Sequence, residues 1–159
     1  WKLAGHGEMG AGGMMATVDV LGEEVRRADE ARAIARAYVD VLAAIERERL
    51  DANISVKLTA LGLKIDAAAC RKQFARILEK AGALGIFVRI DMEDSSVTEE
   101  TIRIYTEARR VTERVGLVLQ AYLHRSRDDA RKVLAKNYPA DKMASDGQNR
   151  SKPWWKFWN

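Results

Sequence analysis

Residues 87–94 read FVRIDMED, a short apolar run that ends in a cluster of charges. Side chains of a β-strand point alternately to its two faces, so this run has one apolar face and one charged face. The apolar face holds Val88, Ile90 and Met92, and the charged face holds Arg89, Asp91 and Glu93. A strand of this kind predicts that one side packs in a core while the other side faces a polar space.

Three further runs repeat the pattern, namely MMATVDVL (14–21), NISVKLTAL (53–61) and GLVLQAYL (116–123). Their polar faces carry Thr17 and Asp19, then Ser55, Lys57 and Thr59, then Gln120, Tyr122 and His124. Apolar residues at helical spacing follow each run, over 31–45, 70–84, 102–111 and from about 126 to 134. Ser96 with Glu99 matches a capping box at the start of the third helix.

The strand and helix patterns therefore alternate four times. The last three strands start about 32 residues apart, which is the length of one βα unit in a parallel sheet. An open sheet covered on both sides needs two apolar faces on each strand, whereas the inner face of a barrel can turn polar at its mouth. We predict an α/β fold, a partial (βα)8 TIM-type barrel of four units. The chain is then part of a larger enzyme, or two copies associate.

The flanking segments lack these periods. We interpret residues 1–13 as a flexible glycine-rich segment, 14–136 as the half-barrel and 137–159 as an irregular, non-homologous tail. GHGEMG (5–10) matches a dinucleotide fingerprint only literally, because it precedes the first strand instead of following it. The tail contains WWKFW, which suits either an inert extension or docking to a membrane or partner.

Composition narrows the classes of function. The 159 residues carry a formal net charge of +4, without a basic stripe interleaved with aromatics, so nucleic acid is not a predicted partner. Cys70 is the only cysteine, which excludes an intrachain disulfide, and it falls on an apolar helix stripe. No signal peptide or membrane span is evident, and we predict a cytoplasmic protein. The chain begins at Trp1, which we interpret as a cut end.

Lys57 is the most informative candidate. An ammonium group that points into a barrel needs an anion beside it, because burying an unpaired charge is costly. Asp91 or Glu93 on the next strand, or a substrate carboxylate, could supply that anion. The acidic cluster could also bind a hard cation, but the remaining sequence offers no ligand cluster, so no metal is predicted. Gln120 suits the edge of a heterocycle, or a bond to a neighbouring strand end.

Three motifs, ISVKLTALGL, FVRIDMEDSSVTEETIRIY and GLVLQAYLHRSRDD, together with TVDVLGEEV at 17–25, resemble proline dehydrogenases over roughly residues 16–134. The resemblance implies an FAD-dependent oxidation of L-proline to pyrroline-5-carboxylate, with a membrane quinone as acceptor and a location at the periphery of the inner membrane. It also implies that Lys57 lies beside flavin and substrate, that Asp91 supports it, and that Gln120 and Arg125 bind the cofactor. We assign Glu93 and Tyr122 to support of the substrate site.

The family's second barrel half, with its remaining cofactor contacts and carboxylate-binding arginines, has no counterpart in this sequence. We therefore expect the chain alone to bind FAD weakly and not to turn over proline. Two other functions stay open. One is a Schiff-base aldolase or lyase with Lys57 as nucleophile. The other is a non-catalytic half-barrel that self-associates through its exposed strand edges.

Overall fold

The computed structural model describes residues 15–22 and 25–137. The predicted glycine-rich segment at 1–13, with GHGEMG, and the WWKFW tail lie outside these residues. The chain divides into two units, residues 1–120 and 121–159, which are described separately below.

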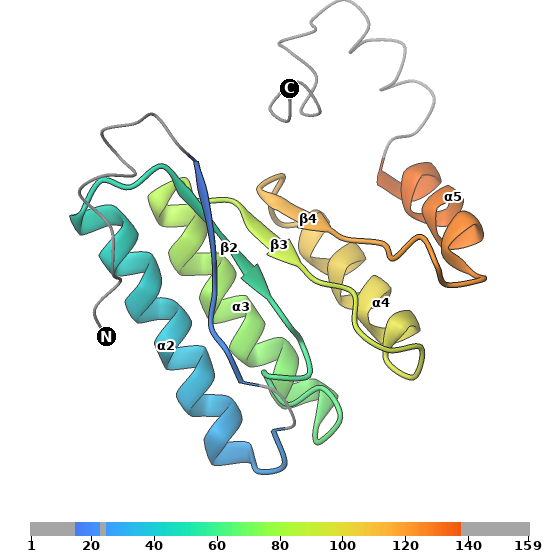
Figure 1. Ribbon diagram of the computed structural model, residues 1–159, viewed down its shortest axis with the longest axis horizontal. Coiled ribbons are helices and arrows are strands. Elements are labelled where there is room, and N and C mark those ends of the chain that lie inside the picture. Colours follow the sequence, from blue (N-terminus) through green and yellow to red (C-terminus); the bar gives the residue numbers. More distant parts are fainter. Residues whose placement is uncertain (1–14, 23–24, 138–159) are drawn as a thin grey trace, which may run out of the picture. The chain divides into compact units, whose positions relative to one another are not determined.

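The first unit is a parallel sheet with strands in chain order, β1 (Ala16–Asp19), β2 (Ala52–Val56), β3 (Val88–Ile90) and β4 (Val115–Leu117). All three neighbouring pairs are parallel. Three helices connect the strands, α2 (Ala28–Arg47), α3 (Ala67–Leu84) and α4 (Thr98–Arg109). The helices lie along one face of the sheet (Figure 1). This is half of a TIM-type barrel, as the sequence predicted.

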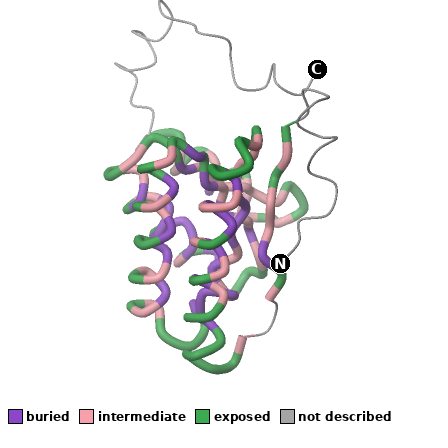
Figure 2. Tube along the Cα trace, turned by 90° about the vertical axis from the view of Figure 1, so that its left-hand side faces the viewer, coloured by how far each residue is buried: buried purple, intermediate pink, exposed green. Residues whose placement is uncertain are grey.

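The core lies between the sheet and the helices (Figure 2). The strands β2 and β3 contribute their predicted apolar faces, and α2, α3 and α4 contribute most of the apolar positions that their spacing predicted. Side chains that are almost fully buried include Tyr38, Leu42, Ile54, Val56, Cys70, Phe74, Ile77, Val88 and Ile90. Burying an aliphatic or aromatic side chain of this size stabilises a fold by about 1.5–3 kcal/mol. The opposite face of the sheet is therefore free to carry polar groups.

Local signals explain where the helices begin and end. Glu30 Oε2 accepts a hydrogen bond from the backbone N–H of Arg27, the N-cap of α2, at 3.2 Å. Asp66 caps α3 by accepting from Ala68 N at 2.9 Å and from Ala69 N at 3.0 Å. Gly85 ends α3 with φ +69°, a left-handed conformation that glycine adopts without strain.

Two predictions about the third helix are wrong. Its N-cap is Val97, because Ser96 instead bonds to Asp94 through its backbone N–H at 2.9 Å and through its hydroxyl. Val111 lies beyond the end of α4 and is 86% exposed, so it does not belong to the buried stripe. An Asx turn at Asp94 thus takes the hydroxyl that the capping box would have used.

The second and fourth strands end well before the residues at which the sequence predicted their ends. After Val56 the chain enters a turn from Leu58 to Ile65, in which Leu58, Leu61 and Leu63 are all buried. Gly62 in this turn has φ +89°, and a Cβ atom there would lie 3.2 Å from the Cβ of Ala31 in α2. Periodicity alone does not distinguish such a buried turn from a strand. β4 likewise ends at Leu117, so the predicted strand face of Gln120, Tyr122 and His124 does not exist.

The second unit contains α5 (Ser126–Asn137), which begins where the sequence predicted. Arg125 precedes it and contacts Asp129 with two nitrogens, Nε to Oδ2 at 2.5 Å and Nη2 to Oδ1 at 3.0 Å. The Asp129 side chain is nearly buried, at 3% exposure. This ion pair orders the first turn of α5.

Candidate functional site at the carboxyl ends of the strands

The polar side chains of the first unit gather where the parallel strands end. Asp19 is the last residue of β1, Lys57 directly follows β2, and Asp91 directly follows β3. The carboxyl ends of parallel strands lie at the same edge of a sheet. In a TIM-type barrel this edge is the mouth, where reactions take place. We call this region the strand-end site.

Lys57 has an ion-pair partner on the preceding strand. Its Nζ contacts Oδ2 of Asp19, and both side chains are 26% exposed. Asp91, Glu93 or a substrate carboxylate was expected to supply the anion, and the structure adds Asp19, which was not predicted. Asp19 shares its predicted face with Thr17 and ends the first strand, and these were the signals that could have identified it.

Asp91 is held by a separate set of bonds. Ser55 Oγ donates to Asp91 Oδ1 at 2.6 Å, and Arg89 Nε lies 3.4 Å from the same oxygen. Arg89 Nε also donates to Ser55 Oγ at 3.2 Å. Ser55 is 2% exposed, so it lies inside the sheet, beneath the barrel mouth. From there the Ser55 hydroxyl, together with the Arg89 guanidinium, holds the Asp91 carboxylate in place. Ser55 was grouped with Lys57 by alternation, but its role was not predicted.

Glu93 is anchored to the turn that follows Lys57. Its Oε2 accepts from Thr59 N at 3.0 Å, and its Oε1 accepts from the Thr59 hydroxyl. Gln120 lies three residues beyond β4, and its Nε2 donates to the Met92 carbonyl oxygen at 3.0 Å. The sequence left two roles open for Gln120, and the structure contains one of them, the bond to a neighbouring strand end. Four of the six predicted site residues, Lys57, Asp91, Glu93 and Gln120, thus belong to the first unit.

The other two predicted residues belong to the second unit. Tyr122 is 76% exposed, and Arg125 makes the ion pair with Asp129 described above. Tyr122 lies in a turn and not on the fourth strand as predicted, whereas Arg125 lies in a turn after that strand, where a loop was expected.

A hollow of about 390 Å³ opens at the strand-end site. Its lining residues are Val25, Lys57, Thr59, Lys64, Met92, Glu93 and Asp94. Ligand pockets run from about 300 to 1,000 Å³, so this one suits a small substrate or the edge of a larger cofactor. Lys64 Nζ lies 2.6 Å from Asp94 Oδ2, and hydrogen bonds from Lys64 and Ser96 lower the pKa of Asp94 to about 2. Asp94 is therefore ionised at neutral pH.

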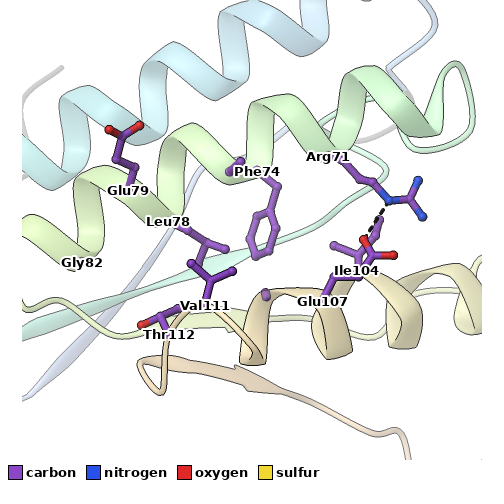
Figure 3. Close-up of a pocket in the computed structure, with 11 residues that line it drawn as sticks. Arg71, Phe74, Leu78, Glu79, Gly82, Ile104, Glu107, Val111 and Thr112 are labelled. Atoms are coloured by element: carbon purple, nitrogen blue, oxygen red, sulfur yellow. Dashed lines mark hydrogen bonds and ion pairs between the residues drawn. The ribbon is translucent and has the colours of Figure 1, made fainter.

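A larger hollow, of about 510 Å³, lies elsewhere, between α3 and α4. Figure 3 shows Phe74, Leu78, Ile104 and Val111 along it, with the ion pair of Arg71 and Glu107 at one side. This groove is on the helix layer, away from the strand ends. Its size does not make it the better candidate, because the strand-end site holds the converging polar groups.

The described residues contain neither a candidate metal site nor a candidate membrane span. Among residues 15–22 and 25–137, no group of three or more His, Cys, Asp or Glu side chains is placed to bind a metal ion. Within the same ranges, no helix is both long enough and apolar enough to cross a bilayer.

Consecutive parallel βα units, with charged groups at the carboxyl ends of β1, β2 and β3, define the class, the TIM-type barrel enzymes. The family model described as proline dehydrogenase matches residues 6–141, and the chain belongs to that family. Proline dehydrogenase 1 of Bacillus subtilis (strain 168) is 36% identical over 121 residues, which cover 76% of this chain and 40% of that protein. Proline dehydrogenase 2 of the same strain is 37% identical over 122 residues, with coverage of 77% and 40%. The chain thus spans about 40% of the length of these relatives.

Solved structures agree on the fold. Proline utilization A from Bdellovibrio bacteriovorus, inactivated by N-propargylglycine, superposes with a TM-score of 0.69 at 22% identity, covering 77% of this chain and 16% of that one. A mutant of the Bradyrhizobium japonicum protein gives a TM-score of 0.65 at 22% identity, with coverage of 77% and 15%. The half-barrel predicted from the sequence is therefore confirmed by structural likeness as well as by family.

Proposed function

We propose that this chain carries part of the active site of an FAD-dependent proline dehydrogenase, which oxidises L-proline to pyrroline-5-carboxylate. The observation that carries the proposal is the strand-end site itself. Lys57 and Asp91 are each held in place by neighbouring strands, at the mouth of a barrel whose family oxidises proline. The bound flavin would accept the hydride equivalent, and electrons would pass on to a membrane quinone.

The residues fit their proposed roles. The Lys57 ammonium faces a hollow that can take a five-membered ring, and it would attract the carboxylate of proline. Asp91 is oriented by Ser55 and would support the network around the substrate. Gln120 has its amide fixed by the Met92 carbonyl, which preorganises the carboxamide for a heterocycle edge. Glu93 would support the substrate side, and we extend the proposal to Arg125 on the cofactor side and Tyr122 on the substrate side.

Because the chain covers about 40% of its relatives, we expect the 159 residues alone to bind FAD weakly and not to oxidise proline. The purified chain can be mixed with FAD, separated from free flavin by gel filtration and examined for flavin absorbance. A bound flavin band, or dye reduction driven by proline, would contradict this expectation.

A chimera tests the proposed function directly. The 121 matching residues of Bacillus subtilis proline dehydrogenase 1 are replaced by those of this chain, and proline-dependent dye reduction is measured. We expect activity, and we expect Lys57→Met to lower kcat/KM by about 10- to 150-fold, the equivalent of a charge-assisted bond of about 1.5–3 kcal/mol. Lys64→Met is the matched control, because Lys64 lines the same hollow in an exposed ion pair. A folded, flavin-loaded chimera that leaves proline unchanged would refute the proposal.

The aldolase alternative is less well supported. A Schiff base forms from a neutral amine, whereas the carboxylate of Asp19 in contact with Lys57 favours the ammonium form. Borohydride treatment with a carbonyl substrate separates the two functions, because a covalently labelled Lys57 is expected only for the aldolase.

Association of two chains is a further proposal. Within the described sheet, β1 and β4 each pair on one side only, and such edges can add another strand. Size-exclusion chromatography of the purified chain tests it, and a monomer at high concentration would contradict it.

A further inference from the structure

Tyr38 connects the helix layer to the strand-end site. It lies in α2, is fully buried at 0% exposure, and its ring belongs to the core. Its hydroxyl lies 2.9 Å from Asp19 Oδ1 and 2.8 Å from the Ser55 carbonyl oxygen, and it accepts from Val20 N at 3.4 Å. A buried hydroxyl with these partners is a specific polar contact inside an apolar layer.

Asp19 divides its two oxygens between the core and the site. Oδ1 faces the Tyr38 hydroxyl, and Oδ2 contacts Lys57 Nζ. Burial, together with the nearby Asp19 carboxylate, raises the pKa of Tyr38 far above its usual value, so the phenol keeps its proton. The rotation of the Asp19 carboxylate, and with it the position of the lysine, therefore depends on a group in the helix layer.

We propose that Tyr38 is a positioning residue, which holds the Lys57 ammonium at the strand-end site by way of Asp19. The consequence for proline rests on the proposed function, since the lysine would be set where the substrate carboxylate arrives. The positioning itself does not rest on it. The phenylalanine ring has the same shape as the tyrosine ring, so packing alone does not account for the hydroxyl.

A purely structural role is the competing explanation, because the same hydroxyl also links α2 to the backbone of Val20, directly after β1, and to the backbone of β2. Loss of these links would lower the stability of the fold, but it would not change the reactivity of Lys57 relative to that of other lysines. The reactivity of Lys57 relative to another lysine therefore separates positioning from packing. Lys64 is a suitable reference, since it lines the same hollow and is paired with Asp94.

The experiment measures amine acylation of the full chain at neutral pH, with each lysine followed by peptide mapping. Only the neutral amine can attack an acylating reagent, so an ammonium held against a carboxylate reacts slowly. We expect Tyr38→Phe to raise the Lys57 to Lys64 rate ratio by about fivefold, the equivalent of one hydrogen bond of about 1 kcal/mol. Asp19→Asn removes the charge of this carboxylate and should raise the ratio further.

Two controls make the result specific. Tyr105→Phe removes a hydroxyl from another buried helix tyrosine, in α4, and should leave the ratio unchanged. In the Asp19→Asn background, Tyr38→Phe should add nothing, because the link through which it acts has gone. Urea midpoints for every variant show that labelling is done on folded protein.

An unchanged ratio in Tyr38→Phe would overturn the proposal, as would a further rise in the Asp19→Asn background. Neither outcome depends on catalysis. The positioning role of Tyr38 can therefore be refuted while the proposed function stands, and the proposed function can be refuted while the positioning role stands. In the active chimera, positioning predicts that Tyr38→Phe raises KM for proline about fivefold while kcat changes less.

Discussion

The bond between Ser55 and Asp91 should contribute measurably to stability. Ser55 Oγ donates to the Asp91 carboxylate at 2.6 Å from a position that is 2% exposed. A hydrogen bond to a charged group is worth about 1.5–3 kcal/mol. Ser55→Ala leaves Arg89 at 3.4 Å as the remaining partner on that oxygen, so we expect a loss of about 2 kcal/mol in the free energy of unfolding.

Urea unfolding followed by circular dichroism measures this loss. With a slope of about 1–3 kcal/mol/M, a change of about 2 kcal/mol lowers the midpoint by about 1 M. Ser96→Ala is the matched control, because Ser96 also bonds an aspartate, Asp94, but at an exposed position. We expect that control to lose about 0.5 kcal/mol or less.

A double-mutant cycle assigns the loss to the pair. Ser55→Ala and Asp91→Asn, separately and combined, should show a coupling energy of about 1–2 kcal/mol. Equal midpoints for Ser55→Ala and Ser96→Ala would refute the reasoning. So would additive losses in the cycle, because the serine would then stabilise the fold without the carboxylate.

Three further predictions concern the scaffold. Gly62→Ala should lower the free energy of unfolding by about 1–3 kcal/mol, because Gly62 has a positive φ. Gly82→Ala should raise it by about 0.5–1 kcal/mol, because a Cβ atom there would meet open space. Thermal melts of the two variants check both values. Lys64→Met should raise the pKa of Asp94 from about 2 toward 3.8, as measured by an NMR titration. Because the pKa of Asp94 is lower in the folded state, the ionised carboxylate stabilises the fold fully above about pH 4, and this stabilisation is lost as the pH falls toward 2. Burial raises the pKa of Cys70 to about 12, so the thiol should react with a disulfide reagent at pH 8 only as fast as the protein unfolds, and fast labelling of the folded chain would contradict this.

Alternation and helical spacing were sufficient to predict the fold. Val88, Ile90 and Met92 are buried, and the side chains of Arg89 and Asp91 are partly exposed, as the period of two required. The predictions failed where the chain leaves regular structure. An apolar run such as Leu58 to Leu63 has the composition of a strand, and only its packing as a turn shows otherwise.

The site was predictable in part. Lys57 was identified because a lysine on the inner face of a barrel needs a counter-ion, but neighbouring strands lie on both sides of β2. The sequence does not say which neighbouring strand supplies an anion, and in the structure Asp19 of β1 contacts Lys57. The link of Tyr38 to the site could not be predicted, because a tyrosine on an apolar helix stripe is indistinguishable in sequence from an ordinary core residue.

The strand order of the sheet has a consequence for folding. Each pairing joins strands that are consecutive in the chain, as in Ala16 with Ala52, Ile54 with Val88 and Val88 with Val115. Every step therefore closes a loop of similar length, at a similar cost in chain entropy. The polypeptide can then gain structure one unit at a time. The first two strands, β1 and β2, also share Tyr38, whose hydroxyl bonds to Asp19 in β1 and to Ser55 in β2.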